Sequence, residues 1–274
     1  MDSVDMSAGT TGSIDFVKVA LDVAEQAKRE NVILRVLGAA AFRIHCPKNI
    51  KVHDALGRAL SDVDFMSYTK ERDKVERLFT GPVLKYQVIK AAVTPGLFIG
   101  RCIFIDKSGA RPHVDVFLDR LEMNHVIDFK GRLEIDYPTI PLAELLLEKV
   151  QIVHINEKDI KDSIVLLLEH DVGEGDTGTI NLPRIVKIMS EEWGFYYTTT
   201  MNLNKIKSFL PKYEVLTEEQ RNLVASRIDK LLQAIENSSK SFRWKMRARV
   251  GTSKKWYTEV EEVERAEHLG SSQG

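Results

Sequence analysis

Two aspartates stand one residue apart in the stretch SDVDFMS, whose valine and phenylalanine predict a short strand that enters a core. Side chains at positions i and i+2 of a strand point to the same face, so Asp62 and Asp64 point together while Val63 and Phe65 face the other layer. The stretch HVDVF repeats this alternation around a third acid, Asp115. If the two strands are neighbours in a sheet, three carboxylates converge on one small volume.

Three converging carboxylates need positive charge among them, because like charges repel and raise one another's pKa. A pair of divalent metal ions is a common solution, and such a pair organises in-line attack at phosphorus. Carboxylate oxygens suit Mg²⁺ or Mn²⁺, and Mg²⁺ is often held by a few carboxylates together with substrate phosphates. The opposing interpretation is that an isolated Asp-x-Asp caps a helix or decorates a turn. A predicted strand that ends at Gly38 and continues directly into a helix argues against that interpretation, because the start of the helix offers backbone N–H groups to phosphate.

The elements around these acids predict an α+β protein, with a mixed β-sheet and flanking helices followed by a helical half. Ser13 is the predicted N-cap of a first helix whose apolar residues would include Ile14, Val17, Leu21 and Ala24. Strands are predicted over 32–38, 61–67, 96–106 and 113–120, with a hairpin turn over 106–112. Helices are predicted over 39–45, 70–79, 141–155, 157–170, 180–194 and 217–236. The predicted divisions are a disordered tail over 1–12, an α/β domain over 13–137, a helical domain over 138–237, and a basic then acidic segment over 238–274.

The segments VLGAAAFRIH, RALSDVDF and HVDVF together resemble the signature of the nucleotidyltransferase superfamily. That signature is a hydrophobic strand that ends in Gly-Gly or Gly-Ser, an acid-x-acid strand, and a third acid on a later strand. The branch that it resembles is the bacterial minimal and abortive-infection-type nucleotidyltransferases, and more distantly the aminoglycoside nucleotidyltransferases. The resemblance implies Mg²⁺-dependent transfer of a nucleoside monophosphate from an NTP to an acceptor hydroxyl, with release of pyrophosphate. It covers residues 32–170.

The resemblance also implies roles for the three acids and the turn before them. Asp62 and Asp64 would bind the metals that bridge the triphosphate. Asp115 would hold the catalytic metal and help to deprotonate the acceptor. Gly38 and the backbone after it would lie against the β- and γ-phosphates. The superfamily's second Gly or Ser is Ala39 here, which keeps the N–H donor but loses the hydroxyl and most of the freedom to adopt positive φ.

Further positions follow from the same resemblance. Arg58 and Ser61 flank the acids and could contact phosphate. Lys149, in the segment LLLEKVQIVHINEKDIKD, would reach the nucleotide from the helical half. Lys158 and Asp162 belong to the Lys-Asp-x-x-Asp-like element after it, and Asp162 would orient the lysine.

The acceptor stays open between a tRNA end, a hydroxyl of a partner protein and a small molecule. A different class of function is also open, namely a non-catalytic nucleotide-binding or interaction module with a vestigial site. Ala39 supports this alternative, because it replaces the second Gly or Ser of the superfamily signature. The C-terminal stretch KSFRWKMRARVGTSKKWY interleaves basic and aromatic residues, as single-stranded RNA contacts do. We favour pairing of this stretch with the acidic EVEEVERAEH that follows it, within the chain or across a homodimer, over nucleic-acid binding.

Composition excludes several classes of protein. The formal net charge of -1 gives no general affinity for nucleic acid, so only a local patch could supply one. Two cysteines, Cys46 and Cys102, make no disulfide framework and have no metal-ligand spacing, which favours a reducing compartment. No apolar run approaches the ~20 residues of a membrane span, and the N-terminus is acidic and polar, unlike a signal peptide. We therefore expect a cytoplasmic protein without a membrane partner.

Overall fold

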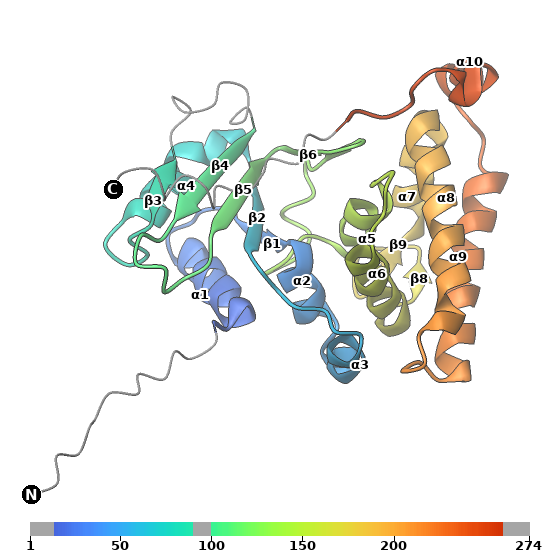
Figure 1. The fold of residues 1–274 in the computed structure, drawn as a ribbon. Helices are drawn as coiled ribbons and strands as arrows, with labels where there is room; N and C mark the ends of the chain where they lie inside the picture. Colours follow the sequence, from blue (N-terminus) through green and yellow to red (C-terminus); the bar gives the residue numbers. More distant parts are fainter. Residues whose placement is uncertain (1–13, 90–99, 260–274) are drawn as a thin grey trace, which may run out of the picture.

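A five-stranded mixed sheet carries both aspartate stretches in the computed structural model, which describes residues 14–89 and 100–259 (Figure 1). The strands lie in the spatial order β1-β2-β5-β4-β3. Their bounds are β1 (Arg35–Leu37), β2 (Val63–Ser67), β3 (Gln87–Ile89), β4 (Arg101–Ile105) and β5 (Val114–Leu118). The pairing of β2 with β5 is parallel, and the other pairings in this sheet are antiparallel. The predicted hairpin between residues 96–106 and 113–120 is thereby confirmed for its described part.

The alternation of side chains along the central strands separates a core face from a polar face. On β5 the residues Val114, Val116 and Leu118 are buried, while Asp115 and Phe117 between them are partly exposed. The same two-residue period makes β4 alternate between buried and partly exposed positions. Apolar packing on the buried face fixes the register of the strands. The acids on the other face are therefore positioned even though they contribute no hydrophobic packing themselves.

Helices surround the sheet and form the second half of the chain. Figure 1 shows α2 between the sheet and the later helices, with α10 at the far end of the helical half. The predicted α+β class, with a mixed sheet and a helical C-terminal part, is confirmed. The helices are α1 (Phe16–Arg29), α2 (Gly38–His45), α3 (Ile50–Ala55), α4 (Arg72–Thr80), α5 (Leu142–Val150), α6 (Glu157–Glu169), α7 (Leu182–Glu191), α8 (Trp193–Phe209), α9 (Glu218–Asn237) and α10 (Phe242–Val250). Two further two-stranded sheets are formed by β6 (Arg120–Glu122) with β7 (Val126–Asp128), and by β8 (Val172–Gly173) with β9 (Ile180–Asn181).

Helix α1 differs from its prediction at both its cap and its buried face. Its N-cap is Asp15, whose side chain accepts from the Lys18 N–H, and the predicted cap Ser13 lies outside the described residues. Ile14 and Leu21 are exposed, and the buried positions are Ala20, Val23, Ala24 and Ala27. Small alanine side chains let the helix approach the core closely, so the narrow alanine face is buried in place of the larger aliphatic residues.

The helical half is joined to the sheet at β1. The segment before α5 lies beside β1, where the Val36 N–H donates to the Pro138 carbonyl at 2.9 Å and the Ile140 N–H donates to the Val36 carbonyl at 3.0 Å. The end of α5 is thereby directed toward the start of α2. One cluster of buried apolar residues runs from Ala20 to Ile235, so the core is continuous across the predicted domain boundary, which itself stays a prediction. None of the helices in the described ranges is long and apolar enough to cross a membrane.

A fully buried carboxylate secures α5. Glu144 accepts from Arg132 Nε at 2.7 Å and from Arg184 Nε at 2.9 Å, and its side chain has no solvent exposure. Loss of this buried charge is costly, because it would leave Arg184 without an ion pair among the described residues and Arg132 with Asp176 alone, at 2.6 Å.

We predict that Glu144→Gln lowers the free energy of unfolding by about 3 kcal/mol, since it removes the counter-charge of two arginines. Denaturant unfolding followed by circular dichroism measures this change. Glu157→Gln is the matched control, because Glu157 pairs with Lys161 at 2.8 Å while its carboxylate is 62% exposed. The control should cost less than about 0.5 kcal/mol. Equal losses in the two variants would contradict the structural importance of the buried group.

Candidate active site

Asp64 and Asp115 are direct neighbours across the parallel pair of β2 and β5. Their Cα atoms are partners in the register of the two strands, and both side chains are half-buried. Adjacent strands lie about 4.8 Å apart, so the two carboxylates project from neighbouring points on one face. The prediction that the two aspartate strands are adjacent is confirmed. Asp62 is half-buried and lies immediately before the first residue of β2.

The crowding of acids has a measurable consequence at Asp64. Burial raises the pKa of the Asp64 carboxyl well above its usual range, and the nearby charges of Asp62, Asp115 and Glu148 raise it further. The positive charge of Lys149 acts in the opposite direction. Four carboxylates therefore act on one another in this region, and a cation bound among them would relieve their repulsion. The fourth, Glu148, was missed by sequence reasoning because it lies on α5, far along the chain.

Gly38 occupies a position that a larger residue would disturb. Its φ is +69°, and an added Cβ would lie 2.5 Å from Asp64 Oδ2. Leu37 is the strand partner of Asp64, so the start of α2 lies directly beside the acid. The Gly38 N–H donates to Glu148 Oε2 at 3.3 Å, and Ala39 is buried in the first turn of the helix. The predicted phosphate-facing N–H thus has a carboxylate partner here.

Lys149 is largely buried and surrounded by acids. Its Nζ lies 3.2 Å from Glu148 Oε1 and 3.5 Å from both Asp159 Oδ1 and Asp162 Oδ2. Burial alone would lower the pKa of Lys149, but the three carboxylates outweigh it and raise the pKa above its usual range. The ammonium group stays charged and is held 5.1 Å from the centre of the Phe42 ring on α2. The predicted cation from the helical half therefore lies against the helix that begins at Gly38.

Asp162 is the buried acid around which several predicted residues gather. It accepts from His53 Nε2 at 2.9 Å and from Arg58 Nε at 3.0 Å, and it lies within ion-pair distance of Lys149. Burial opposes its ionisation, yet Lys149, His53 and Arg58 together lower the pKa of this carboxyl. The predicted contact of Asp162 with Lys149 is present. Arg58 is largely buried on Asp162 and also donates to the Ala59 carbonyl, so its guanidinium supports the site from within.

Two predicted residues lie at the edge of this arrangement. Lys158 is exposed in the first turn of α6, and its neighbour Asp159 makes the contact with Lys149. Ser61 is exposed next to Asp62 in the segment that leads into β2. His53, for which the sequence predicted no role, is a buried partner of Asp162.

Arg101 is a second residue that sequence reasoning missed. Its Nη2 donates to Asp115 Oδ2, and its guanidinium lies 5.0 Å from the centre of the Phe117 ring. Arg101 is the β4 partner of Phe117, two positions beyond Asp115, which makes it a diagonal neighbour of that acid. The Nε atom of Arg101 is shielded from solvent and has no hydrogen-bond partner among the described residues. Nothing in the local sequence reveals this contact, because it depends on the register of β4 with β5.

The donor chemistry of the site suits a hard divalent cation, although its side chains are not arranged as a finished cage. Asp62, Asp64, Asp115 and Glu148 supply the oxygen ligands that Mg²⁺ and Mn²⁺ prefer. Within the ranges 14–89 and 100–259, no three His, Cys, Asp or Glu side chains are already placed to hold one metal ion. Asp115 Oδ2 accepts from Arg101 Nη2, so a cation that bound this oxygen would displace the arginine.

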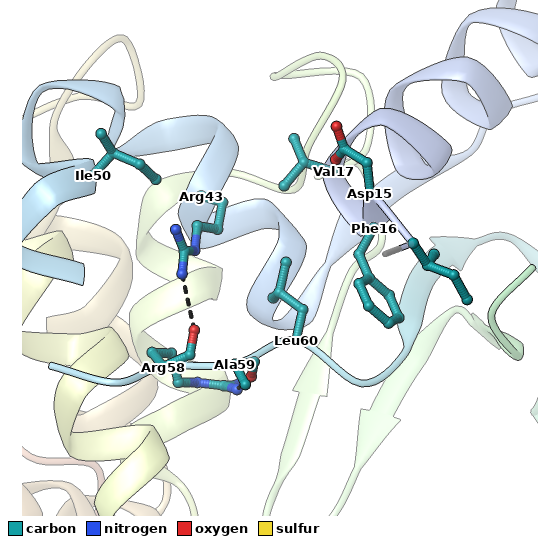
Figure 2. A pocket seen from close by; sticks show the side chains of 9 residues that line it. Asp15, Phe16, Val17, Arg43, Ile50, Arg58, Ala59 and Leu60 are labelled. Atoms are coloured by element: carbon teal, nitrogen blue, oxygen red, sulfur yellow. Dashed lines mark hydrogen bonds between the residues drawn. The ribbon is translucent and has the colours of Figure 1, made fainter. Parts of the chain in front are cut away.

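A pocket of about 410 Å³ lies beside this site rather than over the acids (Figure 2). Figure 2 shows Arg43 donating to the Arg58 carbonyl at one wall, with Phe16 and Leu60 across from them. The three predicted acids do not line this pocket. Arg58 links the pocket to the candidate site, because it lines the pocket and also donates to Asp162.

The chain has a similar fold neighbour among solved structures but no match among family models or curated proteins. Among solved structures, the chain is similar to an antigenic nucleotidyltransferase-like protein from Paracoccidioides brasiliensis, with 13% sequence identity and a TM-score of 0.38. The similarity covers 84% of this chain and 95% of that one.

We predict that Asp64→Asn stabilises the metal-free protein at neutral and alkaline pH. The raised pKa of Asp64 means that the folded state binds this proton more tightly than the unfolded state, so stability falls as pH rises above about 4. Asparagine keeps the shape without that loss. Denaturant unfolding in EDTA over a range of pH measures the difference, which should be largest at pH ~8 and vanish below pH ~4. A variant that is less stable than wild type across this range would contradict the repulsion described here.

Proposed function

We propose that this chain is a nucleotidyltransferase, which transfers a nucleoside monophosphate from an NTP to an acceptor hydroxyl. In that reaction the acceptor oxygen bonds to the α-phosphorus, the bond to the bridging oxygen breaks, and pyrophosphate leaves. The observation that carries the proposal is the in-register placement of Asp64 and Asp115 on parallel strands, directly beside the start of α2 at Gly38. That combination brings metal-binding oxygens and a phosphate-facing helix start to one place.

The chain's own residues have distinct parts in this proposal. Asp62 and Asp64 would hold divalent cations that neutralise the triphosphate, and Asp115 would hold a cation on the acceptor side and help to take the proton of the acceptor hydroxyl. Mg²⁺ or Mn²⁺, when bound, supplies charge neutralisation for the phosphate oxygens and lowers the pKa of the attacking hydroxyl. Lys149 provides a permanent positive charge near the nucleotide, since its acidic partners keep it protonated. The protein's contribution is positioning and electrostatic stabilisation, as for phosphoryl transfer in general.

Arg101 gives the site two states in this proposal. Without metal, it neutralises Asp115. A divalent cation that used Asp115 Oδ2 would displace the Arg101 guanidinium from this oxygen, and the guanidinium would then be available as a positive charge for a phosphate group. Mn²⁺ binding and Arg101 pairing therefore compete for one carboxylate.

A second candidate function is a nucleotide-binding or interaction module without turnover. The contact of Arg101 with Asp115 favours it, because an internal cation can replace the metal permanently. Both candidates leave the acceptor open among an RNA end, a protein and a small molecule. The finer assignment to the bacterial minimal or abortive-infection-type branch belongs with the first candidate.

The direct test supplies each α-labelled NTP with Mg²⁺ and, in separate reactions, total RNA, cell extract protein and small-molecule extract. Wild type should move label into one acceptor fraction, and Asp62→Asn Asp64→Asn should reduce the rate by at least ~100-fold. Asp73→Asn, an exposed acid on α4, is the matched control and should retain the wild-type rate. NTP binding without transfer would favour the second candidate. Neither binding nor transfer would overturn both.

A second test concerns the competition for Asp115. We predict that Arg101→Gln binds Mn²⁺ about tenfold more tightly than wild type, a change the size of one charge-assisted hydrogen bond. Electron paramagnetic resonance of free Mn²⁺ measures the affinity without any need for turnover. Arg120→Gln is the control for general loss of positive charge, because Arg120 forms an exposed pair with Asp128 at 3.5 Å. Unchanged or weaker Mn²⁺ binding by Arg101→Gln would contradict the competition.

A further inference from the structure

All three tryptophans of the chain line one pocket of about 440 Å³ in the helical half. The pocket is formed where the start of α8 meets α10 and the segment that follows α10. Trp193, Trp244 and Trp256 contribute its aromatic walls, and Arg243 and Arg247 also line it. Figure 1 shows α10 at the end of the molecule away from the sheet, so this pocket is separate from the candidate active site.

The walls of this pocket are built from aromatic rings packed against one another and against a guanidinium group. Trp193 is stacked on Tyr197 with ring centroids 5.3 Å apart, and the Arg247 guanidinium lies 4.7 Å from the Trp193 ring centre. Trp244 and Trp256 are only half-buried, so part of each indole remains accessible. The Nε1 donor of Trp244 is shielded from solvent and has no acceptor among the described residues. A ligand with a ring and a hydrogen-bond acceptor would complete these groups.

The segment that forms one side of the pocket is rich in basic residues, while Glu191 and Glu192 line the other side. Between residues 240 and 255 the sequence has no acid and seven basic residues, which are Lys240, Arg243, Lys245, Arg247, Arg249, Lys254 and Lys255. In the described ranges, ion pairs reach only Arg243, at 3.3 Å from Glu192, and Lys255, with Glu259. Lys245, Arg249 and Lys254 are exposed and have no ion pair with a described residue. The predicted pairing with EVEEVERAEH is seen at Lys255 with Glu259, and the rest of that acidic segment lies outside the described residues, so the prediction stays open there.

Helix α10 presents its side chains outward instead of burying them. None of its residues is buried, and Phe242 at its start is 79% exposed. Phe242 thus places an accessible aromatic ring beside the basic residues of α10, and base stacking is a contact that such a ring can make.

We propose that α10 and the tryptophan pocket bind single-stranded nucleic acid. An unpaired base would stack on the accessible indoles, and the phosphates would lie along Lys245, Arg249 and Lys254. A double helix keeps its bases stacked inside and cannot fill an aromatic pocket, so the single strand is the form that fits. The inference is independent of the proposed transfer reaction, because it concerns a different part of the molecule and needs no turnover.

The test uses fluorescein-labelled RNA and DNA single strands of the same sequence, about twelve nucleotides long. Fluorescence anisotropy of the label should report binding that weakens steeply with salt, with log Kd rising by about 3 per decade of NaCl if four phosphates are contacted. Tryptophan emission should be quenched in the same titration, because every tryptophan of the chain lines the pocket. The RNA and DNA arms show which sugar is preferred, and binding of either strand with quenching supports the proposal.

The decisive variant is Lys245→Glu Arg249→Glu, which reverses two exposed charges on α10 and should weaken binding at least tenfold. Lys107→Glu Lys130→Glu makes the same change in net charge at exposed positions elsewhere and should alter Kd less than twofold. No binding of either strand at low salt, an equal loss in the control, or binding without quenching would overturn the proposal. So would binding of polyglutamate or of anionic phospholipid vesicles in place of both strands.

Discussion

The parallel pairing of β2 with β5 sets Asp64 and Asp115 at the same level of one sheet face, within about one strand spacing of each other. Half-buried like charges at that separation repel, and positively charged side chains around the two acids reduce that repulsion. Arg101 from β4 reaches Asp115, and Lys149 from α5 acts on Asp64. The strands tolerate the acids because their opposite face is packed with apolar residues, which fixes the register regardless of the charges. The candidate site is thus a consequence of strand order together with charge balance.

A second layer of buried charge holds the lysine in place. Asp162 on α6 binds His53 from α3, Arg58 from the segment before β2, and Lys149 from α5, so elements of both halves of the chain meet at one carboxylate. Removing one member of such a buried group leaves the others without compensation, which makes the group rigid. Gly38 completes the junction, since any larger side chain there would collide with Asp64. The sheet half and the helical half are therefore connected through the site itself.

The features of the site that depend on local sequence patterns could be predicted. The two-residue period around Asp64 and Asp115 predicted their shared face, and the Gly38 strand-to-helix step predicted the start of α2. Sequence reasoning could not reach contacts fixed only by tertiary packing: Arg101 depends on the register of β4, Glu148 on the approach of α5 to α2, and His53 on the approach of α3 to α6. Lys158 and Asp159 differ because one residue step turns a side chain by about 100° around a helix, so Lys158 is exposed while Asp159 faces Lys149.

The central claim is that Asp64 and Asp115 bind one divalent cation between them in the presence of a nucleotide. The most direct measurement is a crystal structure with Mn²⁺ and a non-hydrolysable NTP, with anomalous diffraction recorded at the manganese absorption edge. The account predicts an anomalous peak within ligand distance, about 2.2 Å, of a carboxylate oxygen of each aspartate, with Arg101 moved off Asp115. A structure with nucleotide bound, no peak between the two aspartates and Arg101 still paired with Asp115 would contradict it.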